Sequence, residues 1–398
     1  MSGPSRFLAG AEAKSDCLAA YEPGDSALEI EVSSKVGTLF GKAIRAAAAA
    51  AAAEFGAGGR LSIRDDGALD YVVAARVEAA LRDAGLSRAP AAGRPVPRRE
   101  PSSRGRLRRT RLYLPGDQPD LPINAGLFGA DSILVDLEDS VAPERKAATR
   151  ILARRLLESH ADFFGSSEIA VRVNPLAESF GAADLEEIVP ARPQALVLPK
   201  CESAEDVAAY DREVSRLEAA AGLPVGSILF MPIVETARGV AKAAEIAAAS
   251  ERNAALCFGA EDYRRDLGLA KRPDEGEILV ARSLVAIAAR AAGIGAQDSV
   301  FADTEDEAGL EASTLAAKNL GFTGKGVVHP RQIAVVHRAF APGAAELEAA
   351  RRVLAAMAAA DGRGVVSLDG KMIDAPVAER ARRLVEYAES AERAAKGS

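Results

Sequence analysis

The most constraining feature of the sequence is a regular alternation of short apolar runs with helical stretches after residue 109. Apolar runs separated by helices are typical of parallel strands that are buried on both faces of a sheet. Eight such units are the number that closes a (β/α)₈ barrel of the TIM type, and an open, doubly wound α/β sheet is the alternative. The eight expected strands are 111–114, 132–137, 168–173, 195–198, 228–234, 254–258, 299–302 and 326–328.

Polar side chains follow the ends of these runs. In a barrel the carboxyl ends of the strands meet at one rim, where active sites of this fold lie. The expected rim residues are Asp117, Asp136, Glu138, Asp139, Arg172, Asn174, Lys200, Glu235, Glu261, Asp262, Asp303 and His329. This set is rich in carboxylates, which suits a hard cation such as Mg²⁺. Glu235 and Asp262 end consecutive strands and are the expected metal ligands, with helix capping as the alternative role.

The expected substrate-binding residues at this rim are Arg172, Glu235 and Lys200. The planar guanidinium of Arg172 suits a substrate carboxylate, and a structural pair with Asp136 or Glu138 can coexist with that role. Lys200 follows a proline and is expected to contact the substrate. A Schiff-base lysine is the alternative, which a metal-dependent site makes redundant.

The segments on either side of the barrel have different patterns. Residues 1–86 predict a small α+β domain, with strands at 27–32 and 60–64 and helices at 35–55 and 70–83. Residues 87–109 contain eight arginines, four prolines and one acidic residue. This stretch lacks any periodicity, so we expect an extended linker that holds two modules apart.

The barrel domain is expected to span residues 110–342, and a C-terminal extension or lid is expected over 343–398. Residues 364–374 predict a hairpin with Asp369-Gly370 at its turn, and a helix is expected over 376–394. An excursion of this kind often closes a site or reaches a neighbouring subunit. By spacing alone, Asp374 would be a helix N-cap.

Length and composition exclude several classes of protein. A chain of 398 residues predicts two or three domains, and its net charge of −7 disfavours nucleic-acid binding. No apolar run reaches the roughly 18 to 20 residues of a membrane span, and the first residues lack a secretory signal. The three cysteines are widely separated, which disfavours disulfides and a zinc cage. These features together favour a cytoplasmic location.

Seven motifs after residue 109 resemble the citrate lyase β chain within the HpcH/HpaI and CitE-like lyases. They are LYLPGDQP (112–119), LVDLEDSVAPERKAATR (134–150), VRVNPL (171–176), LPKCESAEDV (198–207), PIVETARGV (232–240), FGAEDYRRDLG (258–268) and LGFTGKGVVHPRQI (320–333). The resemblance implies that Glu235 and Asp262 hold Mg²⁺ and that Arg172 binds substrate. It also implies that Asp374 enters a neighbouring subunit's site as an acid/base group, within a homotrimer or hexamer.

The front module resembles the citrate lyase γ chain, an acyl carrier that bears a phosphoribosyl-dephospho-CoA arm on serine. The matching segments are AG (9–10), SDC (15–17), LEIEVSSKVGTLFGKAI (28–44) and DDGALDYVVAARVEAAL (65–81). Lys14 stands where the family has its modified serine, so Ser15 is the candidate attachment residue. Gln118 and Asn124 stand where relatives that use free CoA often carry basic residues, and the resemblance also implies a citrate lyase α-type acyl-transferase partner.

The expected activity is that of an Mg²⁺-dependent carbon–carbon lyase. It would cleave a citryl thioester, linked to the carrier or to CoA, into oxaloacetate and an acetyl thioester. Arg172 would fix the substrate carboxylate, and Asp374 or Glu138 would supply a proton to the acetyl enolate. The alternatives are a malyl-CoA or citramalyl-CoA lyase acting on free CoA thioesters, and a non-catalytic acyl-carrier or scaffold fusion.

Overall fold

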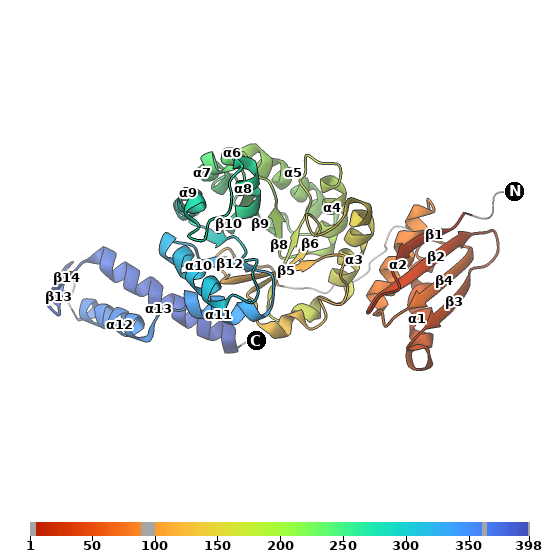
Figure 1. Cartoon of the computed structure of the whole chain (residues 1–398), viewed down its shortest axis with the longest axis horizontal. Helices are drawn as coiled ribbons and strands as arrows, with labels where there is room; N and C mark the ends of the chain where they lie inside the picture. Colours follow the sequence, from red (N-terminus) through yellow and green to blue (C-terminus); the bar gives the residue numbers. More distant parts are fainter. Residues whose placement is uncertain (1–4, 89–99, 360–363, 397–398) are drawn as a thin grey trace.

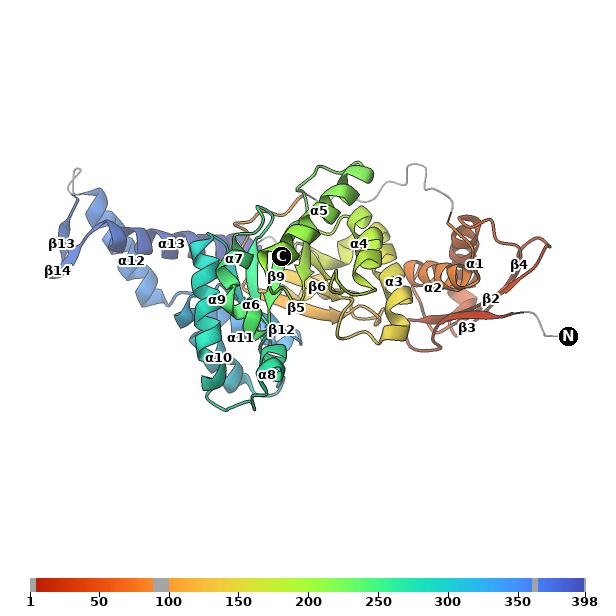
Figure 2. The same cartoon turned by 90° about the horizontal axis from the view of Figure 1, so that it is seen from above.

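The computed structural model describes residues 5–88, 100–359 and 364–396 of the chain. A barrel occupies the middle of an elongated molecule, with the front module on one side and the C-terminal extension on the other (Figures 1 and 2). None of the helices in the described part is long and apolar enough to cross a membrane.

The barrel is closed, with the strand order β10-β11-β12-β5-β6-β7-β8-β9, so the (β/α)₈ prediction is confirmed and the open sheet is wrong. Every pair of neighbouring strands in it is parallel. Its strands are β5 Thr110–Pro115, β6 Ser132–Asp136, β7 Glu168–Arg172, β8 Ala195–Leu198, β9 Leu229–Val234, β10 Ala255–Phe258, β11 Gly295–Asp298 and β12 Gly324–Val327. The surrounding helices are α3 Lys146–Ser159, α4 Gly181–Ile188, α5 Ala204–Ala220, α6 Ala237–Ala241, α7 Ala243–Ala247, α8 Ala260–Leu267, α9 Leu279–Ala291, α10 Glu307–Leu320 and α11 Arg331–Phe340.

The expected seventh strand at 299–302 is wrong, because the strand is β11, Gly295–Asp298. The apolar run that suggested 299–302 lies just beyond the carboxyl end of β11. The strand itself is polar but buried, and each of its two polar side chains has a partner inside the protein. Gln297 donates to the carbonyl of Arg108 (2.7 Å), and Asp298 pairs with Arg282 and Lys325.

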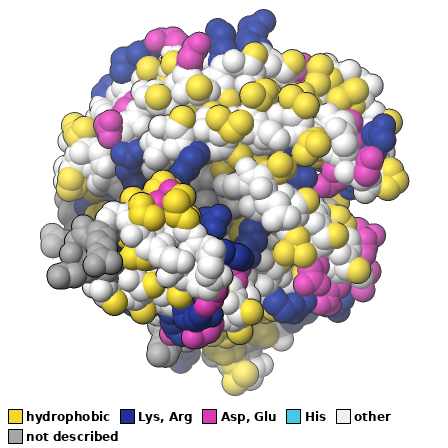
Figure 3. Space-filling model, turned by 90° about the vertical axis from the view of Figure 1, so that its left-hand side faces the viewer, with side chains coloured by type: hydrophobic (Ala, Val, Ile, Leu, Met, Phe, Trp, Pro, Cys, Tyr) yellow, Lys and Arg dark blue, Asp and Glu magenta, His cyan; other side chains and the backbone are white. Residues whose placement is uncertain are grey.

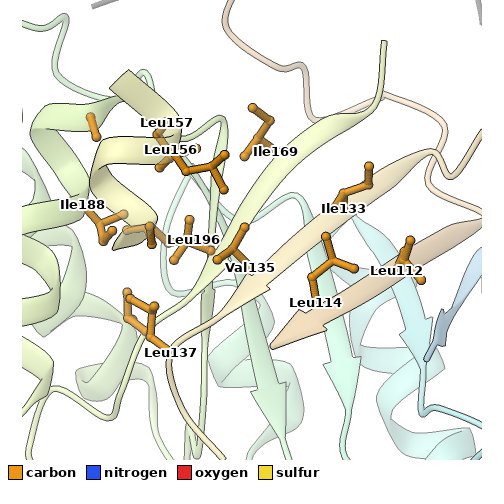
Figure 4. Packing of buried hydrophobic residues seen from close by; sticks show 14 of the residues in the cluster. Leu112, Leu114, Ile133, Val135, Leu137, Leu156, Leu157, Ile169, Ile188 and Leu196 are labelled. Atoms are coloured by element: carbon orange, nitrogen blue, oxygen red, sulfur yellow. The ribbon is translucent and has the colours of Figure 1, made fainter. Parts of the chain in front are cut away.

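Side chains alternate between the two faces of each barrel strand and so form two separate apolar layers. Outward residues such as Leu112, Leu114, Ile133 and Val135 pack beneath the helices, together with Leu156 of α3 (Figure 4). A smaller cluster fills the interior of the barrel, formed by Leu134, Ala170, Ala195, Val197, Leu229, Met231, Ile233, Ala254, Ala255 and Cys257. Inward residues near the carboxyl ends of the strands therefore point toward the rim.

The front module is an α+β domain, as predicted, with a four-stranded sheet in the order β1-β2-β4-β3 and two helices. Its elements are β1 Phe7–Gly10, β2 Cys17–Pro23, β3 Glu29–Ser34, α1 Gly37–Ala53, β4 Gly59–Asp65 and α2 Asp70–Asp83. Strands β1 and β2 were not predicted, because neither FLAG nor CLAAYEP shows a clear alternation of apolar and polar residues.

The front module is docked on the barrel through buried charges. Glu78 of α2 is fully buried and accepts hydrogen bonds from Arg154 and Arg155 of α3, at 2.6 and 2.7 Å. Tyr71, near the start of α2, donates to the carbonyl of Pro119 (2.8 Å) and makes a tilted ring contact with His160, which follows α3. Helix α2 therefore runs antiparallel to α3, and the modules are not held apart as the arginine-rich composition suggested.

The described end of the expected linker is also part of the folded body, whereas residues 89–99 lie outside the described residues. Arg108 is buried and pairs with Glu168 (2.6 Å), and Arg109 is buried and pairs with Asp131 (2.8 Å). Both acidic partners lie at the amino-terminal ends of barrel strands. These arginines close the bottom of the barrel, a role that local composition alone does not reveal.

The C-terminal extension forms a projecting arm (Figure 1). It contains α12 Ala344–Ala358, β13 Val366–Leu368, β14 Lys371–Ile373 and α13 Ala375–Lys396, so the predicted hairpin and final helix are confirmed. Seen from the side on which the arm projects, hydrophobic side chains are spread over the exposed face (Figure 3). The large hydrophobic side chains that are exposed in the structure include Val280 and Ile287 of α9 and Met372 of the hairpin.

The docking charges give a prediction about stability. Glu78→Gln removes the anion that three arginines share, and we expect it to lower the free energy of unfolding by about 3 kcal/mol, as for other broken buried pairs. Urea unfolding measures this change. The control is Glu12→Gln, whose pair with Arg64 is exposed and whose loss should cost below about 1 kcal/mol. Equal effects of the two substitutions would contradict the proposed role of Glu78.

The same residue predicts how stability depends on pH. Burial alone would raise the pKa of Glu78, but Arg154, Arg155 and Arg82 outweigh it and lower that pKa from 4.5 to about 2. Because the pKa is lower in the folded state, this stabilisation is present above pH 4.5 and is lost as the pH falls toward 2. The difference in stability between the wild type and Glu78→Gln should therefore shrink over that interval.

Candidate active site

A cavity of about 460 Å³ opens at the carboxyl-terminal rim of the barrel. The lining residues come from strands β5, β6, β7, β9 and β10 and from the segments that follow β6, β9, β10, β11 and β12. Six of the expected rim residues line this cavity: Asp136, Asp139, Arg172, Glu235, Glu261 and Asp262. The barrel therefore brings together the carboxylates and the arginine that the sequence placed at separate strand ends.

Arg172 ends β7 and is held in place by acidic residues after β6. Its Nε and Nη2 donate to the two carboxylate oxygens of Asp136, at 2.6 and 2.8 Å. Its Nη1 lies 2.9 Å from Glu138 and 3.3 Å from Asp139. The guanidinium also stands over the ring of Tyr113, 5.6 Å from its centroid. The Arg172 side chain is thus fixed in orientation. It makes a structural ion pair with Asp136 and at the same time lines the cavity.

Lys200 and Glu138 form a second ion pair at the rim, with Nζ 2.8 Å from Oε1. Lys200 adopts a positive φ of 52°, an uncommon conformation for a non-glycine residue that is often found at functional sites. Burial raises the pKa of Glu138, although the charges of Arg172 and Lys200 act against this. A carboxyl group with a raised pKa can hold and release a proton near neutral pH.

Glu235 and Asp262 follow two adjacent strands, Glu235 directly after β9 and Asp262 in the first turn of α8, the helix after β10. Glu235 is buried, and its Oε1 accepts a hydrogen bond from the backbone nitrogen of Lys200 (2.7 Å). Within the described residues, Glu235 pairs with no arginine or lysine side chain. Burial and the negative charges of Asp262 and Glu138 raise the pKa of Glu235. A cation bound beside it would favour the ionised form.

The donor set fits Mg²⁺. A side chain at Gly259 would place its Cβ 2.5 Å from Oε2 of Glu235, so glycine leaves space beside this oxygen. Among the residues that the structure describes, no three acidic, histidine or cysteine side chains form a closed metal cage. Mg²⁺ usually keeps waters and binds one or two carboxylates together with substrate oxygens, so an open pair such as Glu235 and Asp262 is sufficient.

Two residues of β5 that sequence reasoning missed also line the cavity. Arg111 and Tyr113 point inward, and Nη2 of Arg111 donates to the hydroxyl of Tyr113 (2.8 Å). The only sequence signal for Arg111 was a charged residue inside an otherwise apolar strand. Its direction became visible only when the register of β5 between β6 and β12 was known.

Glu138 and Lys200 are not among the residues that line the cavity, although Glu138 pairs with Arg172, which does. Four other predicted residues do not line the cavity either. His329 accepts a hydrogen bond from the backbone of Arg331, Asp117 pairs with Arg145, and Asp303 accepts from two backbone amides of its own turn. Asn174 is buried against Lys146 and Asp184.

Asp374 and Ser15 also lie away from the cavity of their own chain. Asp374 caps α13 by accepting from the backbone of Val377 (3.2 Å), on the projecting arm. Ser15 lies in the β1–β2 loop, where its backbone nitrogen donates to the carbonyl of Asp66 just before α2. The start of α2 faces the end of α3 that is remote from the rim. The module is therefore not positioned to swing Ser15 over its own rim.

Comparisons with known proteins agree with this architecture. Residues 109–330 match the family model described as HpcH/HpaI aldolase/citrate lyase, and residues 5–84 match the one described as malonate decarboxylase delta subunit (MdcD). The chain is 40% identical to the citrate lyase subunit beta of Haemophilus influenzae, over 72% of this chain and 98% of that protein. It is 34% identical to the L-malyl-CoA/beta-methylmalyl-CoA lyase of Rhodobacter capsulatus, over 74% and 98%.

A solved structure is similar as well. The protein CitE from Mycobacterium tuberculosis, in complex with magnesium, acetoacetate and coenzyme A, matches 72% of this chain and all of its own, with 32% identity and a TM-score of 0.60. The chain therefore belongs to the HpcH/HpaI aldolase/citrate lyase family, with an acyl-carrier-type domain fused in front of its barrel.

Proposed function

We propose that this protein is an Mg²⁺-dependent carbon–carbon lyase that cleaves a citryl thioester into oxaloacetate and an acetyl thioester. The observation that carries the proposal is one rim cavity that contains both Arg172 and the carboxylates Glu235 and Asp262. Identity to the citrate lyase β subunit exceeds that to the malyl-CoA lyase, which favours the citryl substrate. The assembled site disfavours a non-catalytic scaffold.

Each residue at the rim has a defined task in this proposal. Glu235 and Asp262 would hold Mg²⁺, which when bound supplies Lewis-acid stabilisation of the substrate hydroxyl and its neighbouring carboxylate. Arg172 is fixed by Asp136 and would orient that carboxylate by charge-assisted hydrogen bonds. Lys200 keeps Glu235 in place through its backbone nitrogen and would contact the substrate with its side chain.

Cleavage requires one proton to change position. The substrate hydroxyl loses its proton and becomes the keto oxygen of oxaloacetate. The electron pair of the broken carbon–carbon bond passes to the thioester, and the resulting enolate carbon takes up a proton to become a methyl group. Glu138 is suited to such a transfer because its pKa is raised by burial. Asp374 of a neighbouring subunit is the second candidate acid.

The metal site leads to a direct test. Glu235→Gln or Asp262→Asn should lower lyase turnover on the order of 10³-fold, since Lewis-acid stabilisation is worth several kcal/mol. Citryl-CoA cleavage with and without EDTA, followed by Mg²⁺ addition, measures this. The control is Glu305→Gln, whose carboxylate is 78% exposed, pairs with Arg331 and does not line the cavity, and this variant should keep the turnover of the wild type. Unchanged turnover in both ligand variants, or indifference to EDTA, would exclude the metal mechanism.

The position of Asp374 supports a site shared between subunits of a homotrimer or hexamer. It lies on an arm that projects away from its own barrel, and the arm carries exposed hydrophobic side chains. A shared site is incomplete in a monomer, so activity should depend on assembly.

Subunit mixing tests this arrangement. Asp374→Asn and Asp262→Asn proteins should each be inactive, and mixing them 1:1 under exchange should restore activity at about a quarter of the sites, those that receive both intact residues. Turnover after exchange, with exchange verified by native mass spectrometry, is the measurement. No recovery despite complete exchange would show that Asp374 does not act in a neighbour's site.

We further propose that Ser15 bears the phosphoribosyl-dephospho-CoA arm of the acyl carrier and that an α-type acyl-transferase subunit loads it. Ser15 lies in a loop with a positive φ of 61°, beside the exposed Lys14. Because this loop is remote from the rim of its own chain, the carried thioester is expected to serve the site of a neighbouring subunit. The cytoplasmic location that this function requires fits three cysteines that are all unpaired and buried.

Intact-mass measurement of the protein purified from its native host tests the attachment. The wild type should show the added mass of the arm, and Ser15→Ala should lack it. The control is Ser5→Ala, outside the β1–β2 loop, which should keep the added mass. An unmodified wild type that cleaves free citryl-CoA as fast as Ser15→Ala would identify the front module as a structural domain only.

A further inference from the structure

Arg111 differs from every other buried arginine in the described part of the chain. Eight buried arginines have a carboxylate partner: Arg76, Arg108, Arg109, Arg154, Arg155, Arg252, Arg264 and Arg282. Arg111 is 3% exposed, and no described carboxylate lies within ion-pairing distance of it. A guanidinium cannot lose its proton in a protein, so the chain buries an uncompensated positive charge.

The neighbours of Arg111 accept hydrogen bonds from only some of its donor atoms. Nη1 donates to Sγ of Cys257 (2.9 Å) and Nη2 donates to the hydroxyl of Tyr113 (2.8 Å), whereas Nε has no partner. The remaining surroundings are the apolar interior of the barrel, including Met231. Neither a thiol nor a phenol neutralises a cation, so the electrostatic cost of burial is not repaid within the protein.

Arg111 also lies at the cavity rather than in a sealed core. It lines the same cavity as Arg172, and these two are the only basic residues among the described lining residues. Both guanidinium groups stand near the Tyr113 ring, 5.3 Å from the centroid for Arg111 and 5.6 Å for Arg172. Arg172 is already neutralised by Asp136, which leaves Arg111 as the lining cation without a counter-ion.

Strand β12, which pairs with β5, leaves space beside Arg111 and Tyr113. Gly326 of β12 is in register with Arg111. A Cβ at Gly326 would lie 2.7 Å from Val300 and 3.2 Å from the ring of Tyr113. The hydroxyl of Tyr113 accepts from Arg111, and its own hydrogen remains available to donate to an anion.

We propose that Arg111 is the specificity-determining residue that binds the second carboxylate of the substrate. This inference rests on the proposed lyase function. A citryl thioester carries one carboxylate beside its hydroxyl, for Arg172 and the metal ligands, and a second on a methylene arm, for Arg111 and Tyr113. A malyl thioester lacks the second carboxylate and would leave Arg111 uncompensated, so the site selects dicarboxylate substrates.

Two small ligands isolate this interaction, because pyruvate is oxaloacetate without its second carboxylate. Calorimetric titration in the presence of Mg²⁺ should show that the wild type binds oxaloacetate roughly 10- to 100-fold more tightly than pyruvate, the range expected for a buried charge-assisted hydrogen bond. Arg111→Met should remove this difference while changing the pyruvate affinity by less than about twofold. The same variant should lose the preference for citryl-CoA over malyl-CoA in kcat/KM.

Arg282→Met is the matched control, since Arg282 is equally buried but pairs with Asp298. It should lower the melting temperature and leave the ratio of the two affinities unchanged. Arg111→Met should not lower the melting temperature, because it removes a charge that the fold does not compensate. Tyr113→Phe keeps the ring and tests the site independently: it should weaken oxaloacetate binding and spare pyruvate.

Several results would overturn the assignment. Equal affinities of the wild type for oxaloacetate and pyruvate would refute the role of Arg111 while leaving the lyase proposal standing. If Arg111→Met loses affinity for oxaloacetate and for pyruvate equally, Arg111 is a structural residue. The same conclusion follows if the variant has a lower melting temperature and an unchanged ratio of the two affinities. Failure of the wild type to bind either ligand with Mg²⁺ would refute the lyase function and this inference together.

Discussion

The pairing of β12 with β5 is the contact on which the rest of this structure depends. It joins the last strand to the first and closes eight parallel strands into a barrel. Closure leaves no unpaired edge, and it directs every carboxyl end to one rim. Residues as far apart in sequence as Asp136, Glu235 and Asp262 meet at one cavity for this reason. The same register turns the Arg111 side chain into the barrel. In an open sheet with helices on both faces, this side chain would have faced a helix.

Compensation of buried charge is the second principle of the molecule. Acidic partners neutralise arginines at the bottom of the barrel, between the two domains and beneath the helices. These pairs hold elements in place, because breaking one leaves an isolated buried charge. Within the described residues, two side chains beside the rim cavity are exceptions, since Glu235 has no basic side-chain partner and Arg111 has no acidic one. One binds a cation and the other an anion in the function that we propose.

The buried charges between the two domains also determine where the carrier domain lies. A tethered carrier depends on a free linker, whereas here Glu78 is fully buried between Arg154 and Arg155 of the barrel domain. The carrier is therefore fixed on the flank of the barrel, with Ser15 remote from the rim of its own chain. The C-terminal arm likewise carries Asp374 away from that rim. In the function that we propose, both features require a functional unit larger than one chain.

The sequence by itself determined the number of barrel strands, the α+β class of the front domain, the C-terminal hairpin and six of the seven charged residues that line the cavity. These follow from local periodicity and from the rule that polar residues at parallel strand ends converge. Only the tertiary structure decided that β11 is a polar strand, that Arg108 and Arg109 are buried at the bottom of the barrel, and that α2 packs on α3. It alone also turned Arg111 toward the cavity. In each case the energy of a charged or polar group depends on a partner distant in sequence, which local patterns do not contain.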